Sequence, residues 1–170
     1  AFQKMPIKKL VVCSGGEESE AIRELARGYS NINVNGWVDN ETLANLIGNC
    51  IATLYLPVDE DFGMTPLESM SAGKPCIGVK EGGVKESIIE GKTGLFVPAD
   101  YTIEDIVFAI KMLTPELAFA MKDSFIERAS EFSVERFESN LNSFLIKKRV
   151  VIDAYRSAGG IQKTGVEVVS

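Results

Sequence analysis

The sequence predicts an α/β domain in which a parallel β-sheet is covered by helices on both faces. Short apolar runs alternate along the chain with segments of helical periodicity, as they do when each strand is followed by a crossover helix. Glycine and proline residues mark most of the boundaries between these segments. The length of 170 residues is sufficient for one domain with a buried core.

The predicted strands are short and apolar, which is typical of strands buried inside a parallel sheet. The first ends at Gly15-Gly16, and the second alternates apolar and polar residues until it breaks at Gly36. The predicted strands are residues 8–14, 31–38, 50–57, 74–79 and 93–98.

The predicted helices lie between these strands and after the last of them. Residues 17–29 place Ala21, Ile22, Leu25 and Ala26 at helical spacing. Asn40 is the predicted N-cap of a helix over 40–49, and shorter helices are predicted over 66–71 and 84–91. From Ile103 to about Arg149 the pattern is helical, with interruptions near Pro115 and before Ser133, another predicted N-cap.

The domain organisation follows from where these patterns begin and end. Residues 1–148 are predicted to form one domain, and residues 149–170 a tail without clear helical periodicity. The opening residues "AFQKMP" resemble the end of a helix that leads into the first strand. We therefore expect a domain that lacks its own first strand and helix, in a chain cut from a longer protein.

Composition excludes several classes of function. Hydrophobic content of 45% and charged content of 25% are ordinary for a soluble globular protein. A net charge of −6 argues against a nucleic-acid surface, and no apolar run approaches the roughly 20 residues of a membrane span. Without histidine, the chain has no imidazole base and no histidine metal ligand, and no metal site is expected.

The three cysteines cannot form a closed set of disulfides, and their spacing is not that of a metal site. Cys13, Cys50 and Cys76 lie at or within predicted strands, so we expect them to be small buried hydrophobic residues. Reduced cysteines of this kind predict a cytoplasmic protein.

The stretch with most chemical content is "DEDFGMTPLESMSAGKP", residues 59–75. Thr65 is a predicted N-cap and Pro66 the predicted first helical residue, so Thr65 and Glu68 would form a capping box. On this interpretation Glu68 serves only its own helix, and the acids at 59–61 form only a solvated loop.

The same geometry also suits a ligand. Free amides of Gly63, Met64 and Thr65 at a helix start would attract a diphosphate, because they carry partial positive charge. Carboxylates would repel that phosphate but accept hydrogen bonds from sugar or ribose hydroxyls. Glu60 and Glu68 would then hold sugars on either side of the phosphate. The two interpretations of Glu68 are compatible, since a carboxylate has about four acceptor sites.

Residues 60–68, which read "EDFGMTPLE", resemble the E-x7-E motif of retaining family 4 glycosyltransferases with the GT-B fold. The resemblance continues through "SMSAGKPCIGVKEGGVKESIIEGKTGLFVPAD", and reaches back through "NVNGWVDNETLANLIGNCIATLYLP" and "LVVCSGG". It covers about residues 8–148. It implies a Rossmann-like domain, the C-terminal, donor-binding half of such an enzyme.

The resemblance also implies roles for single residues. Glu60 matches the first glutamate, the candidate catalytic residue that contacts the donor sugar near the reacting carbon. Glu68 matches the second, which holds the ribose hydroxyls, and Val38 lies in the turn whose backbone reads the nucleobase. Gly15 and Gly16 match the glycine turn near the nucleotide. Sugar and phosphates would meet the backbone and hydroxyl of the segment Phe62, Gly63, Met64 and Thr65.

This sequence departs from the family pattern in two ways. In the family, an arginine and a lysine that neutralise the diphosphate come from a strand and helix just before the strand that is the first one here. That pair is absent from this sequence, as is the N-terminal acceptor-binding domain. Lys74, Lys80 and Lys85 lie near the predicted site but are interpreted as solvated surface lysines. Asp61 stands where many members have glycine or alanine; it would either contact the sugar or only extend the acidic rim.

The resemblance implies a hexosyltransferase that moves a sugar from a nucleotide-sugar to an acceptor hydroxyl in glycan or polysaccharide assembly, with retained configuration. No cofactor is expected beside that substrate. The "DEDFG" loop is most similar to those of mannosyltransferases, which favours GDP-mannose and leaves UDP-sugars open. Alone, this part is expected to bind donor weakly and to be inactive. The basic cluster in "IKKRVV" is either a solvated helix end or a peripheral contact with a membrane that carries the acceptor.

Two other classes of function stay open at the level of sequence. A sugar-nucleotide epimerase of similar fold would need catalytic residues that this histidine-free part lacks. A non-catalytic α/β module would bind nucleotide equally well after Glu60→Ala or Glu68→Ala.

Overall fold

The computed structural model describes residues 1–13 and 15–157 of the 170-residue chain. It divides into two compact units, residues 1–130 and residues 131–170. The first unit contains every predicted strand and every predicted site residue. The second contains the last helix.

The strands of the first unit pair in parallel, as predicted, but in two sheets. Strands β1 (Leu10–Cys13) and β2 (Ile32–Gly36) form one sheet, with an irregularity in register between Val12 and Cys13. Strands β3 (Thr53–Tyr55), β4 (Cys76–Val79) and β5 (Gly94–Val97) form the other, in that order. The predicted single ladder is therefore divided, and each strand is shorter than the apolar run that predicted it.

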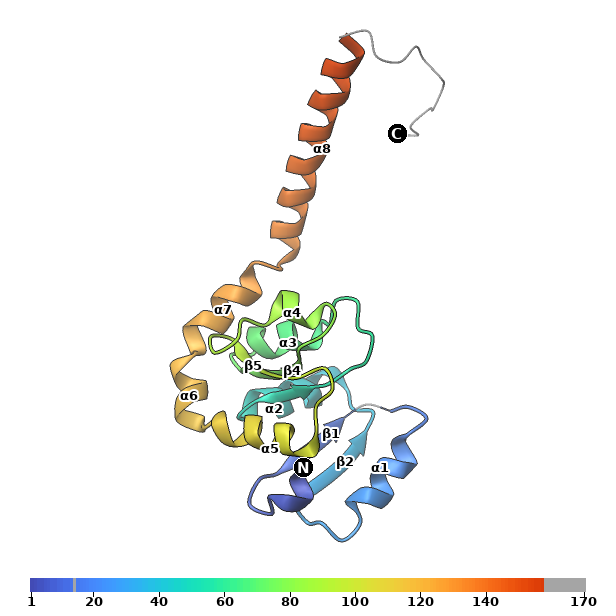
Figure 1. Ribbon diagram of the computed structural model, residues 1–170, viewed down its shortest axis with the longest axis vertical. Helices are drawn as coiled ribbons and strands as arrows, with labels where there is room; N and C mark the ends of the chain where they lie inside the picture. Colours follow the sequence, from blue (N-terminus) through green and yellow to red (C-terminus); the bar gives the residue numbers. More distant parts are fainter. Residues whose placement is uncertain (14, 158–170) are drawn as a thin grey trace. The chain divides into compact units, whose positions relative to one another are not determined.

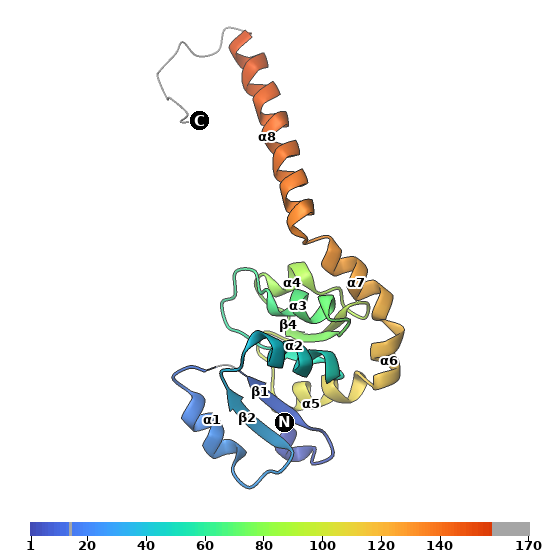
Figure 2. The same ribbon diagram turned by 180° about the vertical axis from the view of Figure 1, so that it is seen from behind.

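Helices cover both faces of the three-stranded sheet. In Figures 1 and 2, α3 (Thr65–Ser71) and α4 (Val84–Ser87) lie on one side of it, and α2 (Asn40–Asn49) and α5 (Ile103–Met112) on the other. Helix α7 (Lys122–Ser130) packs against α3, and α6 (Pro115–Ala120) precedes it. Helix α1 (Ser19–Ala26) packs against β2, and a 3₁₀ turn, η1 (Phe2–Lys4), precedes β1.

The core lies around the three-stranded sheet. All four residues of β4 are buried, and the side chains of Met70 on α3 and Phe125 on α7 are completely inaccessible to solvent. Helices α1 and α2, by contrast, contain no buried residue. Most of the hydrophobic stabilisation therefore belongs to the half of the unit that carries the loop after β3.

Two predicted helix caps are wrong. Asp39, not Asn40, caps α2: its Oδ1 accepts from the amide of Thr42 at 2.7 Å. The backbone of Asp39 is extended, as a cap requires, whereas Asn40 is already helical. Thr65 is likewise inside its helix, so the predicted capping box with Glu68 does not form. The cap position falls on Met64, and Pro66 occupies the second helical position.

The second unit contains α8 (Val134–Ser157). Ser133 is confirmed as its N-cap, since its Oγ accepts from the amide of Arg136 at 3.2 Å. The helix continues past residue 148, so the expected start of a tail at 149 coincides with no break in secondary structure, and residues 158–170 lie outside the described part. Over its described length, no helix is long and apolar enough to cross a membrane.

Candidate functional site

The predicted site centres on the loop between β3 and α3. The chain leaves β3 at Tyr55 and turns twice through left-handed backbone, at Asp59 with φ 54° and at Gly63 with φ 75°. A left-handed conformation is costly for most residues and free for glycine, so Gly63 suits its position. These two turns fold residues 59–63 back over the end of the strand.

The Glu60 carboxylate holds this loop together. Its Oε1 accepts from the amides of Phe62 at 3.3 Å and Gly63 at 3.1 Å, and its Oε2 accepts from the Tyr55 hydroxyl at 2.5 Å. The Tyr55 hydrogen bond, followed by that of the Phe62 amide, lowers the pKa of Glu60 below its ordinary value. The same hydrogen bond, with burial, raises the pKa of Tyr55 to about 12. At neutral pH, Glu60 is therefore ionised and Tyr55 protonated.

This arrangement corrects the expectation that the Gly63 amide is free for a phosphate. The amide donates to Glu60, because the left-handed turn brings it back toward that side chain. The amides of Met64 and Thr65 precede the first intrahelical bonds, in which Leu67 and Glu68 donate to the Met64 carbonyl. Only these two of the three predicted amides remain candidates for an anion.

Glu68 and Asp61 are placed differently from Glu60. Helix α3 buries Pro66, Leu67, Ser69 and Met70, and Glu68 is exposed on its opposite face. Asp61 is also exposed, at the tip of the loop, and the ring of Phe62 beside it is 38% exposed. Because the predicted capping box does not form, both carboxylate oxygens of Glu68 can accept hydrogen bonds from a ligand.

A glycine pair after β4 supports the loop from behind. The Gly83 amide donates to the Glu60 carbonyl at 2.9 Å. A Cβ at Gly82 would lie 2.2 Å from the Glu60 carbonyl oxygen, and one at Gly83 would lie 2.1 Å from that of Asp61. No side chain fits at either position. In the sequence, two consecutive glycines between a predicted strand and a predicted helix indicate a turn, but no local pattern predicts this contact.

The second group of predicted residues lies at the ends of β1 and β2. Cys13 is opposite Gly36 in the parallel pair, so the segments that follow them, with Gly15 and Gly16 on one side and Val38 on the other, start side by side. Val38 is half-buried and Trp37 before it is 82% exposed. In both Figure 1 and Figure 2, the segment after β2 and the loop after β3 leave their sheets on the same side of the first unit.

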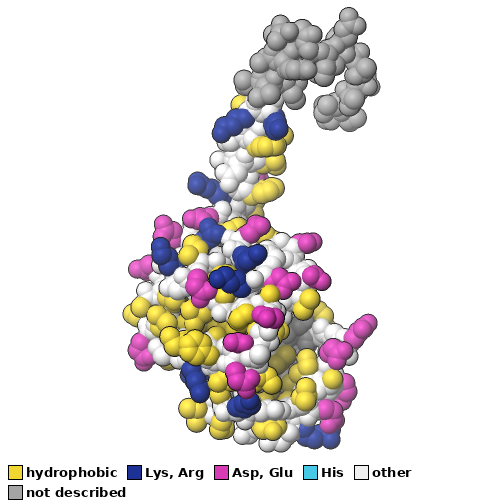
Figure 3. Space-filling model, viewed as in Figure 1, with side chains coloured by type: hydrophobic (Ala, Val, Ile, Leu, Met, Phe, Trp, Pro, Cys, Tyr) yellow, Lys and Arg dark blue, Asp and Glu magenta, His cyan; other side chains and the backbone are white. Residues whose placement is uncertain are grey.

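The lysines near the predicted site are distributed more widely than expected. Lys74 precedes β4, and parallel pairing puts it beside the start of β3, at the end of the sheet opposite the loop. Lys80 follows β4, and its ammonium lies 6.0 Å from the centre of the Phe96 ring. Lys85 is exposed on α4. On the face seen in Figure 3, basic and acidic side chains are interspersed, without a continuous basic area.

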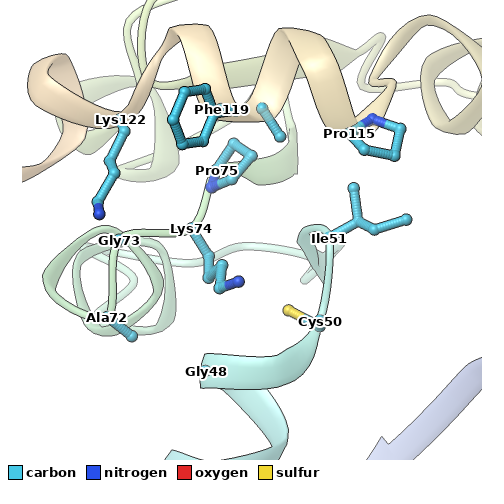
Figure 4. Close-up of a pocket in the computed structure, with 11 residues that line it drawn as sticks. Gly48, Cys50, Ile51, Ala72, Gly73, Lys74, Pro75, Pro115, Phe119 and Lys122 are labelled. Carbon is cyan, nitrogen blue, oxygen red and sulfur yellow. The ribbon is translucent and has the colours of Figure 1, made fainter.

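A cavity of about 430 Å³ lies at that opposite end of the sheet and contains no predicted site residue. Figure 4 shows Lys74 and Cys50 pointing toward each other across it, with Phe119 beside Pro75. Burial raises the pKa of the Cys50 thiol, which the nearby Lys74 partly offsets. A neutral thiol is a poor nucleophile, so the cavity has no evident reactive group.

The cysteine prediction is confirmed for one residue only. Cys76 is completely buried, which raises the pKa of its thiol to about 12, whereas Cys13 and Cys50 are half-buried. All three are free thiols. Among the side chains that the structure describes, those of residues 1–13 and 15–149, no group of three or more Cys, Asp or Glu is placed to hold a metal ion.

Comparison with known families identifies this arrangement. Residues 1–131 match the family described as "Glycosyl transferases group 1". The chain belongs to this family. The match includes both groups of predicted site residues and ends one residue beyond the first compact unit.

Individual relatives agree with that assignment. The chain is 36% identical over 114 residues to a protein from Dictyostelium discoideum named "Alpha-1,3/1,6-mannosyltransferase ALG2", and the match covers 65% of this chain and 26% of the relative. This chain therefore spans about a quarter of the length of that relative.

Solved structures confirm the fold. Sucrose-phosphate synthase from Thermosynechococcus elongatus superposes with a TM-score of 0.69 at 23% identity, over 84% of this chain and 39% of the other. Anabaena Alr3699/HepE in complex with UDP superposes with a TM-score of 0.61 at 19% identity, over 82% of this chain and 41% of the other. The first unit thus has the Rossmann-like α/β fold of GT-B glycosyltransferases.

Proposed function

We propose that this chain is the donor-binding part of a retaining glycosyltransferase that transfers mannose from GDP-mannose to an acceptor hydroxyl in glycan or polysaccharide assembly. The observation that carries the proposal is the Glu60 carboxylate, held ionised by three hydrogen bonds in a group 1 glycosyltransferase domain. An anchored, ionised acid beside the donor sugar can orient its hydroxyls and favour positive charge at the reacting carbon.

The arrangement of the two glutamates supports a division of roles. Glu60 keeps acceptor capacity for a sugar hydroxyl, because its three donors use only part of about four lone-pair sites. Glu68, exposed on α3, would accept from the two ribose hydroxyls. Asp61 is exposed at the loop tip and is proposed to extend the acidic rim that faces the sugar.

Of the parts of the proposed ligand, the diphosphate has the fewest candidate contacts in this chain alone. The amides of Met64 and Thr65 remain candidates, but α3 has only seven residues and Gly63 is engaged by Glu60. We propose that a basic pair and the acceptor-binding domain are supplied from outside these residues, and that this part alone is inactive. No cofactor is needed other than the nucleotide-sugar, which is a substrate.

Mannose is supported by the Dictyostelium relative, whose name is that of a mannosyltransferase. A UDP-sugar is the second candidate, and it is supported by the neighbour of known structure that holds UDP. The three free thiols fit the proposed cytoplasmic location. The basic residues 147–149 do not form a helix end, because α8 continues to Ser157, and they are proposed to be a solvated stretch within that helix. At position 148 the ammonium lies 5.5 Å from the Phe144 ring centre.

The test is an NMR titration of the isotope-labelled chain with GDP, UDP, ADP and GDP-mannose. We expect selective shifts of the amides of Val38, Gly63, Met64 and Glu68 with GDP and GDP-mannose. Glu68→Ala should weaken GDP binding about ten-fold or more, as expected for loss of a charged hydrogen bond. The matched control is Glu127→Ala, an exposed acid on α7, which should leave binding unchanged.

Other outcomes would redirect the assignment. Shifts with UDP alone would replace GDP by UDP. Unchanged binding in Glu60→Ala and Glu68→Ala would favour a non-catalytic module, and interconversion of free UDP-sugars by a chain extended at its amino end would favour an epimerase. If that extended chain also binds no nucleotide at millimolar concentration, the proposal is wrong.

A further inference from the structure

Arg128 on α7 is hydrogen-bonded to the end of another helix. Its Nε donates to the Ser87 carbonyl at 3.1 Å, and its Nη2 donates to the Glu86 carbonyl. Both acceptors lie at the carboxyl end of α4, 41 and 42 residues earlier in the chain. Arg128 is half-buried, and its guanidinium therefore joins two segments that no local sequence pattern connects.

Helix α4 depends on such contacts because it is a single turn of four residues, Val84–Ser87. A helix of this length is not stable by itself, and the last carbonyls of any helix have no acceptor role within it. Arg128 supplies donors for two of these carbonyls. The planar guanidinium, with several N–H groups in a fixed fork, suits two neighbouring acceptors better than the single nitrogen of a lysine does.

The other end of α4 supports the loop that carries Glu60. Gly83 directly precedes the helix and donates to the Glu60 carbonyl at 2.9 Å. Val84, the first helical residue, is completely buried, and its Cγ2 lies 3.4 Å from where a Cβ at Gly63 would be. A displacement of α4 would therefore move the backbone and the side chain against which the loop is packed.

Helix α7 gives Arg128 a fixed base. Phe125, one turn earlier on α7, is completely inaccessible to solvent, and α7 packs against α3. Helix α3 directly follows the loop in the chain. Figure 1 shows α7 next to α3 and α4. The two helices that border the loop are thus both held by α7, α3 through packing and α4 through Arg128.

We propose that Arg128 is a positioning residue of the donor site, which fixes α4 and, through the Gly82-Gly83 turn, sets the position of Glu60. This inference rests on the proposed function, since it names a residue that supports the Glu60 side of that site. A group that contacts substrate is effective only when the structure around it holds it in place. If Arg128 only stabilised the fold, its removal would leave the Glu60 carboxylate of the folded chain unchanged.

The first test needs no ligand and follows Gly83 and Glu60 by NMR. Arg128→Met removes the donors and keeps an unbranched apolar stem, whereas Arg128→Lys keeps the charge without the fork. In Arg128→Met, the Gly83 amide should exchange with solvent about five-fold faster relative to the amides of β4, as for loss of one hydrogen bond. The pKa of Glu60 should rise toward its ordinary value, because its hydrogen bonds from Tyr55 and the loop amides loosen.

Arg128→Lys separates this effect from simple electrostatics. Because lysine retains the positive charge, a rise in the pKa of Glu60 in this variant comes from the lost geometry. We expect the Gly83 exchange rate and the Glu60 pKa to change in the same direction as in Arg128→Met, and by less. If Arg128→Met does not fold, unchanged values of both in Arg128→Lys overturn the inference.

The second test measures donor affinity by NMR titration. Arg128→Met should weaken GDP-mannose about three-fold or more and GDP less, because Glu60 is proposed to contact the sugar. In a Glu60→Ala background, Arg128→Met should cause no further loss, since its effect passes through Glu60. The matched control is Arg27→Met, at an exposed arginine that pairs with Glu24 on α1, and it should change none of these quantities.

The outcomes distinguish this inference from the proposed function. If Arg128→Met lowers only the free energy of unfolding, with parent values of Gly83 exchange, Glu60 pKa and GDP-mannose affinity, Arg128 is not a positioning residue and the proposed function stands. If GDP-mannose binds neither this chain nor a chain extended at its amino end, the proposed function is wrong, and the inference fails with it.

Discussion

At the scale of single residues, the hydroxyl of Tyr55 decides how Glu60 is presented. It donates to Oε2 at 2.5 Å, a distance typical of a strong hydrogen bond to an ionised acceptor. The opposite carboxylate oxygen is held by the loop's own backbone. Tyr55 comes from the strand and the amides from the loop, so the carboxylate is fixed from two directions.

Removing this hydroxyl should change the charge behaviour of Glu60. In Tyr55→Phe the pKa of Glu60 should rise toward its ordinary value, because the largest contribution that lowers it is lost. Affinity for GDP-mannose should fall by a few-fold, since the carboxylate loses its fixed orientation. The measurement is a pH titration of the Glu60 carboxyl carbon by NMR. Tyr29→Phe, at an exposed tyrosine, is the control, and an unchanged Glu60 pKa in Tyr55→Phe would contradict the assignment.

The same pair predicts the pH range of loop stability. The pKa of Glu60 is depressed by folding, so its contribution is present above the unfolded value of about 4.3 and lost as pH falls through the lower folded value. The pKa of Tyr55 is raised to about 12, so its contribution is present below about 10 and is lost as pH rises toward 12. Tyrosinate absorbance against pH should show one tyrosine titrating late, absent in Tyr55→Phe.

Gly83 allows a sharper test of the loop's support. Its φ of −69° is open to any residue, so Gly83→Ala acts only through the Cβ placed 2.1 Å from the Asp61 carbonyl oxygen. We expect a loss of roughly 1–3 kcal/mol in the free energy of unfolding, from displacement of packed backbone. Gly48→Ala, in an open position of α2, should not destabilise the chain. Urea unfolding of both variants measures the difference in the free energy of unfolding. Equal stabilities would contradict the prediction, because they would show that the loop moves away from the new Cβ without destabilising the chain.

At the scale of elements, helix caps differ in their use of side chains. Helix α5 has a complete capping box, in which Asp105 N donates to Thr102 Oγ1 and Thr102 N donates to Asp105 Oδ2 at 2.8 Å. Helix α3 begins after Met64 with no side-chain cap at all. Its start is stabilised instead by burial of Pro66 and Leu67.

This contrast predicts different costs for the same substitution. Thr102→Ala should lower the free energy of unfolding by about 1 kcal/mol, the usual value for a lost N-cap. Thr65→Ala should cost less than about half of that, because Thr65 is already helical and caps nothing. Chemical denaturation of both variants gives the comparison. If Thr65→Ala lowers the free energy of unfolding more than Thr102→Ala does, Thr65 is the N-cap that the sequence predicts.

The elements themselves were predictable from local pattern, whereas the loop was not. Apolar runs between glycines and prolines located every strand, because a strand buried on both faces has few alternatives. Asp39 and Asn40 are both good cap residues, and only the backbone conformation distinguishes them. The hydrogen bond from Tyr55 to Glu60 spans only five residues, but it depends on the left-handed turn at Asp59, which no apolar pattern predicts. The contact with Gly82-Gly83 comes from a segment distant in sequence, so no local pattern contains it.

At the scale of the whole molecule, packing is uneven within the first unit. The buried side chains gather around β4, α3 and α7, and the β1–β2 sheet with α1 contributes few of them. Amide hydrogen exchange should follow this distribution, slowest in β4 and fastest among the regular elements in α1. Exchange measured by NMR at neutral pH tests it. Equal protection in β4 and α1 would mean that the first unit opens only as a whole.

The internal hydrogen bonds of Glu60 have a consequence for the thermodynamics of binding. A loop that became ordered only around its ligand would lose conformational entropy at that moment, and affinity would fall accordingly. The hydrogen bonds of residues 59–63 to the Glu60 carboxylate are made within the loop itself and do not depend on contacts with a ligand. A donor sugar bound as proposed would meet a preorganised surface, and its association should show a small entropic penalty and little change in backbone order on this side of the site.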